Sequence, residues 1–181
     1  MIYVALLRGI NVGGNSKVEM KRLKEVFEGL GHTNVSTYIN SGNVIFHSPE
    51  ENAQKLVDKL EKAIDKEFGF NIKVIVKSLK EMEVISEKLP DFWKNDLEMK
   101  TDVMFLWEEV DNQKVLASMT IKPDLDNVVY IKGALLWMVK RKDVTRSGMM
   151  RLAGSPLYKQ MTIRNVNTFR KLLSLMKAVK S

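Results

Sequence analysis

The sequence predicts an α+β protein of two tandem ferredoxin-like halves with mainly antiparallel sheets. Two observations lead to this prediction. The chain of 181 residues reads twice as strand, helix, two strands and helix, and the paired strands around residues 38–45 have a counterpart around residues 130–136. Antiparallel central hairpins with helices on one face are typical of α+β rather than doubly wound α/β proteins. We expect one half at 1–78, a helical connector at 79–100 and a second half at 101–181.

The first half has a strong turn and capping signal at nearly every boundary. Ser16 and Glu19 have the spacing of a capping box, and Gly31 is typical of a helix end. The expected elements, in order, are a strand over 2–7, a helix from Ser16 to Gly31, strands over 35–39 and 44–46 around the hairpin turn 40–43, a helix from 48 to Gly69, a strand over 72–76, and a connector helix from Ser78 to Lys88.

The second half has the same order but weaker signals. We expect a strand over 102–107, a short helix over 112–119, strands over 128–132 and 135–140, and a final helix from Thr162 to near 179. No closing strand is evident before that helix. Either a strand is exchanged between the halves or the sheet simply ends.

Composition excludes several classes of protein. Hydrophobic residues make up 45% of the chain, which is ample for a core, and cysteine is absent, which excludes disulfides and thiolate chemistry. The start of the chain lacks a basic region and a long apolar run, and no stretch approaches the roughly 20 apolar residues of a membrane span. We therefore expect a soluble, cytoplasmic protein without a membrane partner.

The positive charge is concentrated at the end of the chain. The net charge is +7, yet residues 1–100 hold 15 basic and 15 acidic residues, whereas residues 140–181 hold 11 basic residues and one acid, Asp143. Such asymmetry indicates either an anionic partner or a solvated basic helix. For a nucleic-acid partner the candidate residues are Lys140, Arg141, Lys142, Arg146, Arg151, Arg170 and Lys177, with Tyr130 and Trp137 as aromatics near the second hairpin.

A glycine-rich loop after the first strand is the first candidate binding site. It leads into a helix N-terminus, where free N–H groups attract anions, but it lacks both the P-loop and the dinucleotide fingerprints. The alternative is a tight turn whose glycines serve geometry only. With the hairpin turn, the candidate ligand-binding residues are Arg8, Asn11, Gly13, Gly14, Lys17, Ser41 and Asn43.

The start of the predicted last helix is the second candidate. Thr162 is expected to cap it, which places Arg164, Asn165 and Asn167 in the first turn, where arginine and asparagine are unfavourable. Local rules broken in this way indicate either a binding role or hydrogen bonds to neighbouring loops.

Catalytic chemistry and metal binding have no comparable signal. The two histidines, His32 and His47, have no triad spacing, and the acidic pairs are typical of surface charge. We predict no metal and no cofactor, and the sequence names no catalytic residue.

Three motifs together resemble one bacterial family. They are Ala-Leu-Leu-Arg-Gly-Ile-Asn-Val-Gly-Gly at 5–14, Thr-Tyr-Ile-Asn-Ser-Gly-Asn-Val at 37–44, and Thr-Ile-Arg-Asn-Val-Asn-Thr at 162–168. In this order, across essentially the whole chain, they resemble the family called domain of unknown function 1697. The resemblance implies a duplicated α+β fold and no particular activity.

The sequence is therefore compatible with three functions. The first is a binding protein for an anionic small ligand at the glycine-rich loop and polar turn, because amide and guanidinium groups bind and orient rather than move protons. The second is a nucleic-acid-binding module that uses the basic end. The third is an enzyme acting on a phosphorylated or carboxylated metabolite. The oligomeric state is open.

Overall fold

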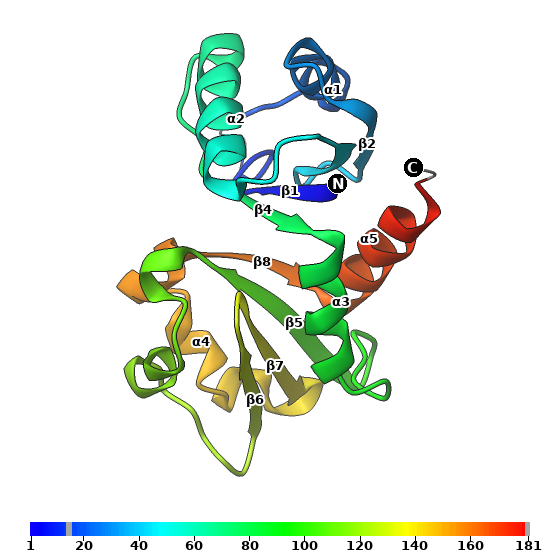
Figure 1. Ribbon diagram of the computed structural model, residues 1–181. Coiled ribbons are helices and arrows are strands. Elements are labelled where there is room, and N and C mark those ends of the chain that lie inside the picture. The colour runs from blue at the N-terminus through cyan, green and yellow to red at the C-terminus, as the bar shows by residue number, and fades with distance from the viewer. Residues whose placement is uncertain (14–15, 180–181) are drawn as a thin grey trace. The chain divides into compact units, whose positions relative to one another are not determined.

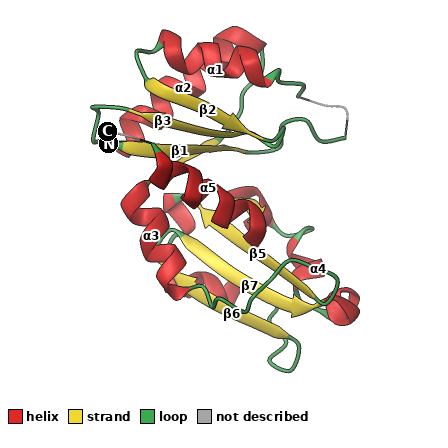
Figure 2. Ribbon diagram, turned by 90° about the vertical axis from the view of Figure 1, so that its right-hand side faces the viewer, coloured by secondary structure: helices red, strands yellow, loops and turns green. Residues whose placement is uncertain are grey.

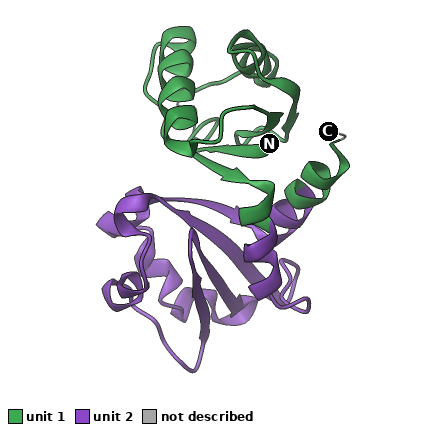
Figure 3. Ribbon diagram, viewed as in Figure 1, with its two compact units in different colours: residues 1–82, 172–181 green, residues 83–171 purple. Residues whose placement is uncertain are grey.

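The computed structural model describes residues 1–13 and 16–179, and the chain divides into two compact units. The first comprises Met1–Met82 with Leu172–Ser181 and the second Glu83–Lys171 (Figure 3). Each contains one four-stranded antiparallel sheet, so the predicted α+β fold of two ferredoxin-like halves is confirmed. The domain boundaries expected at residues 78 and 101 stay a prediction.

The sheet of the first unit has the strand order of a ferredoxin-like fold. Its strands are β1 (Ile2–Leu7), β2 (Thr33–Tyr38), β3 (Asn43–His47) and β4 (Val74–Ser78), in the order β2-β3-β1-β4. All neighbouring strands are antiparallel. Helices α1 (Met20–Gly29) and α2 (Ala53–Phe68) lie on the same face of this sheet (Figures 1 and 2).

The core of the first unit follows from the two periodicities of its elements. Alternate residues of β1, among them Tyr3 and Ala5, face the apolar stripes of α1 and α2, where Phe27 and Leu60 are fully buried. Tyr3 stacks on Phe46 of β3 with ring centroids 5.6 Å apart. Each fully buried side chain of this size contributes about 1.5–3 kcal/mol.

The capping box predicted at Ser16 is wrong. The helix begins at Met20, Glu19 makes no side-chain cap, and Ser16 has a left-handed φ of 51°. A reciprocal capping box lies instead at the expected connector helix α3 (Leu79–Lys88). There Ser78 Oγ accepts the Glu81 N–H at 3.3 Å, and the Glu81 carboxylate accepts the Ser78 N–H at 2.8 Å.

The second unit has a closing strand that the sequence prediction missed. Its strands are β5 (Met99–Leu106), β6 (Asp126–Ile131), β7 (Ala134–Lys140) and β8 (Met161–Asn165), in the order β6-β7-β5-β8. The last helix, α5 (Val166–Ala178), therefore begins four residues after the predicted Thr162. Residues 161–165 pair with β5 because the free edge of that strand supplies hydrogen-bond partners, and this outweighs the local helix signal.

The two units share their sheet order but differ in their connections. Helix α3 follows β4 directly and α5 follows β8 directly, so α5 is the counterpart of α3 rather than of α2. Short segments take the places of α1 and α2. They are the 3-10 helices η1 (Glu108–Val110), η2 (Gln113–Ser118), η3 (Arg141–Arg146) and η4 (Pro156–Gln160), and the short helix α4 (Met149–Leu152).

These short segments cover one face of the second sheet. Trp137 of β7 is fully buried beneath them with Met104 and Leu135, and Leu152 of α4 belongs to the same core. On the opposite face Phe105 packs against Phe169 of α5 at a centroid distance of 6.2 Å. Within the described part of the chain, every helix is too short or too polar to cross a bilayer.

Candidate functional site

The glycine-rich loop and the polar turn meet at one end of the first sheet. The Leu7 N–H donates to the Gly42 carbonyl at 2.8 Å, and Asn11 Nδ2 donates to the Asn40 carbonyl at 2.8 Å. The two motifs are therefore neighbours, as a common site requires.

The Asn11 side chain is used inside this loop. Besides the Asn40 bond, its Nδ2 donates to the Val18 carbonyl at 2.9 Å, and its Oδ1 accepts the Val18 N–H at 2.8 Å. Its φ of 55° is left-handed, a conformation that asparagine tolerates. Both N–H donors of the Asn11 amide and its oxygen are therefore used to hold the loop closed. This favours a structural role for Asn11 in a tight turn over a role in ligand binding.

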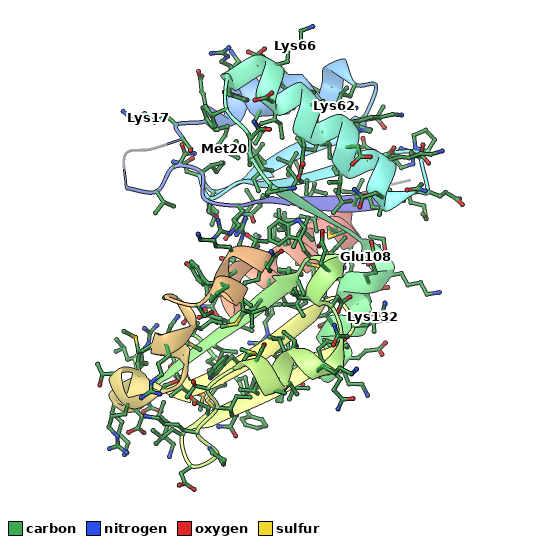
Figure 4. The ribbon with its side chains drawn as sticks, turned by 90° about the vertical axis from the view of Figure 1, so that its left-hand side faces the viewer. Lys17, Met20, Lys62, Lys66, Glu108 and Lys132 are labelled. Atoms are coloured by element: carbon green, nitrogen blue, oxygen red, sulfur yellow. The ribbon has the colours of Figure 1, made fainter. Side chains whose placement is uncertain are left out.

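The other candidates of the first unit differ in exposure. Asn43 is fully buried, and its Nδ2 donates to the Tyr38 carbonyl and to Ser41 Oγ, both at 3.0 Å. Lys17 is exposed just before α1 (Figure 4). Arg8 is half-buried, and its N–H donates to the Lys73 carbonyl at 2.9 Å. Gly13 has a φ of 62°, and Gly14 lies outside the described residues.

The third motif contributes side chains to both faces of the second sheet. Asn165, the last residue of β8, accepts the Thr168 N–H on Oδ1 at 2.9 Å and so caps α5. Asn167 donates to the Asn95 carbonyl at 2.9 Å. Arg164 alternates with Asn165 and lies on the opposite face. It is buried and donates to Thr162 Oγ1 and the Ile163 carbonyl, and burial lowers its pKa to about 10, so it stays charged at neutral pH.

A pocket of about 450 Å³ lies within the second unit, and we call it the β5–β8 pocket. Its polar lining residues come from the two strands and from the loops beside them: Asn95, Lys100, Asp102, Arg141, Tyr158 and Asn165. Its apolar lining consists of Met104, Val144, Met149, Met150, Leu152, Ala153 and Ile163.

The charged groups of the pocket form a small network. Asp102 is buried and lies 2.5 Å from Lys100 Nζ, because residues 100 and 102 share one face of β5. Arg141 Nε donates to the Asp96 carbonyl at 2.9 Å and its Nη2 to Asn95 Oδ1 at 3.1 Å. No hydrogen bond of Arg141 Nη1 is found among the described residues, so one edge of the guanidinium can receive a ligand.

The outer wall of the pocket is fixed to the sheet through Asp126. This buried carboxylate accepts hydrogen bonds from Ser147 Oγ, from the Gly148 N–H at 2.9 Å and from Trp137 Nε1 at 3.2 Å. Burial raises the pKa of Asp126, but these bonds and one from the Lys122 N–H outweigh it, so the pKa lies below its ordinary value. A Cβ on Gly148 would lie 1.8 Å from the Thr120 carbonyl oxygen, so only glycine fits there.

The predicted nucleic-acid residues separate into two groups. Arg170 donates to the backbone carbonyls of Trp93, Pro90 and Asp91 rather than to solvent, and Arg141 is bonded as described above. Lys177 is exposed near the end of α5. The remaining four are also exposed: Lys140, Lys142, Arg146 and Arg151.

Of the two aromatic residues expected at the second hairpin, Trp137 is not available for stacking and Tyr130 is partly buried. Trp137 is fully buried, and the Tyr130 hydroxyl donates to Asp111 at 3.0 Å. Among the described residues, no three His, Asp or Glu side chains come together in the manner of metal ligands.

Comparison with known proteins shows the family of the chain. A family model described as a protein of unknown function, DUF1697, matches residues 1–137, about three quarters of the chain. The chain belongs to the DUF1697 family. The third motif, at 162–168, lies beyond the residues that this model matches.

A solved structure is similar to nearly the whole chain. It is described as the structure of conserved bacterial protein SP0830 from Streptococcus pneumoniae. It has a TM-score of 0.84 and 33% sequence identity, and the match covers 97% of this chain and 98% of that one. No curated protein matches the chain.

Sequence reasoning missed several residues of the β5–β8 pocket, namely Asn95, Lys100, Asp102 and Tyr158. One signal was present: Lys100 and Asp102 are charged residues at alternate positions, followed by Met104, in what is otherwise an apolar central strand. The loop residues have no such signal, because only the fold brings them to β5 and β8.

Proposed function

We propose that this DUF1697 protein binds a small molecule that has an anionic group and an apolar part, and that the β5–β8 pocket is the binding site. One observation carries the proposal: the ion pair between half-buried Lys100 and buried Asp102 and the Arg141 guanidinium lie in the same pocket as an apolar lining. Concave sites with an apolar lining and a few charged groups are the usual form of small-molecule sites.

The charge around the pocket supports an anionic ligand. Residues 140–160, the segment that contains much of its lining, hold six basic residues and one acid, Asp143, and Arg141 is the basic residue of this segment that lines the pocket. Arg141 presents a planar guanidinium, which pairs with carboxylate or phosphate through two parallel hydrogen bonds. Lys100 adds a second cation, held in place by Asp102.

The apolar lining supports an apolar or aromatic part of the ligand. Met104, Met149 and Met150 line the pocket, and methionine side chains adapt to irregular shapes and contact aromatic rings favourably. The volume of about 450 Å³ lies in the range of sites for small molecules.

The sequence-based proposal located the anion at the glycine-rich loop of the first unit. Asn11 and Asn43 both use their amide groups within that loop and turn, whereas Arg141 keeps one edge available. We therefore favour the β5–β8 pocket over the loop for the same class of ligand. The absence of cysteine supports a reducing compartment, and a cytoplasmic location is part of the proposal.

The experiment uses methionine methyl groups as reporters. The protein is labelled with methyl-¹³C methionine and titrated with phenyl phosphate, an aromatic anion, and in parallel with benzyl alcohol, its uncharged analogue. We expect the methyl signals of Met104, Met149 and Met150 to shift with phenyl phosphate and much less with benzyl alcohol. The methyl signal of Met20 on α1 serves as an internal reference.

A matched pair of variants tests the location. Ala153→Phe places a bulky side chain at an exposed position of the pocket lining, and Ala117→Phe makes the same change at an exposed position of η2 outside it. Ala153→Phe is expected to abolish the shifts and Ala117→Phe to preserve them. Equal responses to both aromatic probes, or shifts that survive in Ala153→Phe, would overturn the proposal.

A further inference from the structure

Four exposed cations follow one another along the segment that leaves β7, and we call them the basic surface: Lys140, Lys142, Arg146 and Arg151. The nearest carboxylate to Arg146 is Asp143, at 3.7 Å. In residues 1–13 and 16–179, no ion pair of the other three is found. Their charge is therefore not neutralised by the second unit itself.

The four cations are distributed over three successive elements of the chain. They occupy a strand end, a 3-10 helix and the short helix α4, and none of them lines the β5–β8 pocket. A small anion needs donors that converge, as in that pocket. A row of separate cations on long flexible side chains fits a chain of phosphates instead.

Apolar side chains lie within the same segment. Met150 is 55% exposed, and Tyr158 is 38% exposed, which is unusual for residues of their size. Exposed aromatic and apolar side chains next to cations form the platforms on which unpaired bases stack. In duplex nucleic acid the bases are already stacked on each other, so such a surface favours single strands.

We propose that the basic surface binds single-stranded nucleic acid without sequence preference, with phosphates at its four cations and a base stacked at Tyr158. This mode differs from recognition on the face of a ferredoxin-like sheet, because Trp137 and the face of β7 around it are covered by the short segments. Its four cations are not those of the β5–β8 pocket, although Met150 and Tyr158 also line that pocket.

The test is a fluorescence anisotropy titration of the full-length protein with a labelled oligothymidylate of about 15 nucleotides, long enough for one binding surface. It is repeated from low to physiological salt, and with the same strand annealed into a duplex. Each phosphate contact contributes about 0.7 to the slope of log K against log salt for a single strand. We expect binding at low salt that is stronger for the single strand than for the duplex.

Matched variants assign the binding to the basic surface. Lys142→Gln with Arg151→Gln removes two of its cations, and we expect the salt slope to fall by about 1.4. Lys62→Gln with Lys66→Gln removes two exposed lysines of α2 in the first unit (Figure 4) and is expected to leave the slope unchanged. Tyr158→Phe is expected to keep, and Tyr158→Ala to lose, the preference for the single strand.

Four outcomes would overturn the proposal. They are no binding at low salt, an equal fall in slope for both double variants, equal affinity for single strand and duplex, and binding to phosphatidylserine-containing vesicles without binding to the oligonucleotide. The last outcome would assign the basic surface to membrane lipids.

Discussion

Trp137 donates a hydrogen bond from its indole Nε1 to Asp126 Oδ1 at 3.2 Å, and both side chains are buried. The same carboxylate accepts the Ser147 hydroxyl and the Gly148 N–H, so one residue of β6 ties the pocket wall to β7. The geometry of the β5–β8 pocket therefore depends on a residue that does not line it.

Asp126→Asn is expected to destabilise the second unit by about 2 kcal/mol or more. The amide nitrogen of asparagine would face N–H and O–H donors, and hydrogen bonds to a charged acceptor contribute about 1.5–3 kcal/mol each. Urea unfolding followed by tryptophan emission measures the change. Glu108→Gln, an exposed carboxylate change in the same unit, is the control, and an equal effect of both variants would contradict the assigned role.

The lowered pKa of Asp126 also predicts a pH dependence. Because the folded protein binds this proton less readily than the unfolded chain, the stabilisation is complete above the ordinary carboxyl pKa of about 4 and is lost as pH falls through the folded value. Urea midpoints of wild type and Asp126→Asn should therefore converge in acid. Parallel curves down to the lowest pH would show that Asp126 does not contribute in this way.

Gly42→Ala is expected to cost more than Gly69→Ala, although both glycines have a left-handed φ, 79° and 76°. A Cβ on Gly42 would lie 2.7 Å from Leu7 Cβ, whereas nothing lies within 4 Å of one on Gly69. The shared conformational cost is about 1–2 kcal/mol, and the clash adds about 1–3 kcal/mol at Gly42 alone. Thermal unfolding by circular dichroism compares them, and similar losses would argue against the close approach.

Asn11 is expected to act on stability through its side-chain hydrogen bonds. Asn11→Gly keeps the left-handed φ accessible and removes the three hydrogen bonds, which is expected to lower the free energy of unfolding by about 1–3 kcal/mol. Asn11→Ala removes the same bonds and adds about 1 kcal/mol of backbone strain. Urea unfolding of both variants measures the two contributions. A loss of ligand binding with unchanged stability would instead restore this loop as the anion site.

His32 is expected to make the first unit less stable in mild acid. Its Nε2 is buried without a hydrogen-bond partner among the described residues, and its ring lies 4.7 Å from that of Phe46. Burial, with a smaller effect of Lys59, lowers its pKa below 6.5. The unfolded chain then takes up the proton first, so stability is full above about pH 6.5 and falls as the pH drops below it.

His32→Phe separates this effect from other titrations. The substitution keeps an aromatic ring beside Phe27 and Phe46 and removes the unsatisfied nitrogen, so we expect higher stability and a flatter profile between about pH 5 and 7. The urea midpoint followed by circular dichroism across this range is the measurement. An unchanged pH profile would show that His32 is not the titrating group.

Several features could be predicted from the sequence because they depend on local chemistry. Periodicity identified β1, the central hairpins and α2. Gly69 was identified as the end of α2, and it has the left-handed φ that is common after the last residue of a helix. The glycine-rich loop and the turn at Gly42 were both identified as candidate binding segments, but the sequence left open whether they meet in space. The start of the connector helix at Ser78 was predictable because a capping serine and its helix lie next to each other in the chain.

Other features were decided only by the tertiary structure. Residues 161–165 became a strand because the edge of β5, about sixty residues earlier, offered hydrogen bonds that the local sequence does not encode. Asn165 consequently became the cap of α5 and a lining residue of the β5–β8 pocket, and Arg164 turned to the other face. Side chains from β5, β8 and the loops around them meet there through sheet pairing, and a single sequence does not record pairing between distant segments.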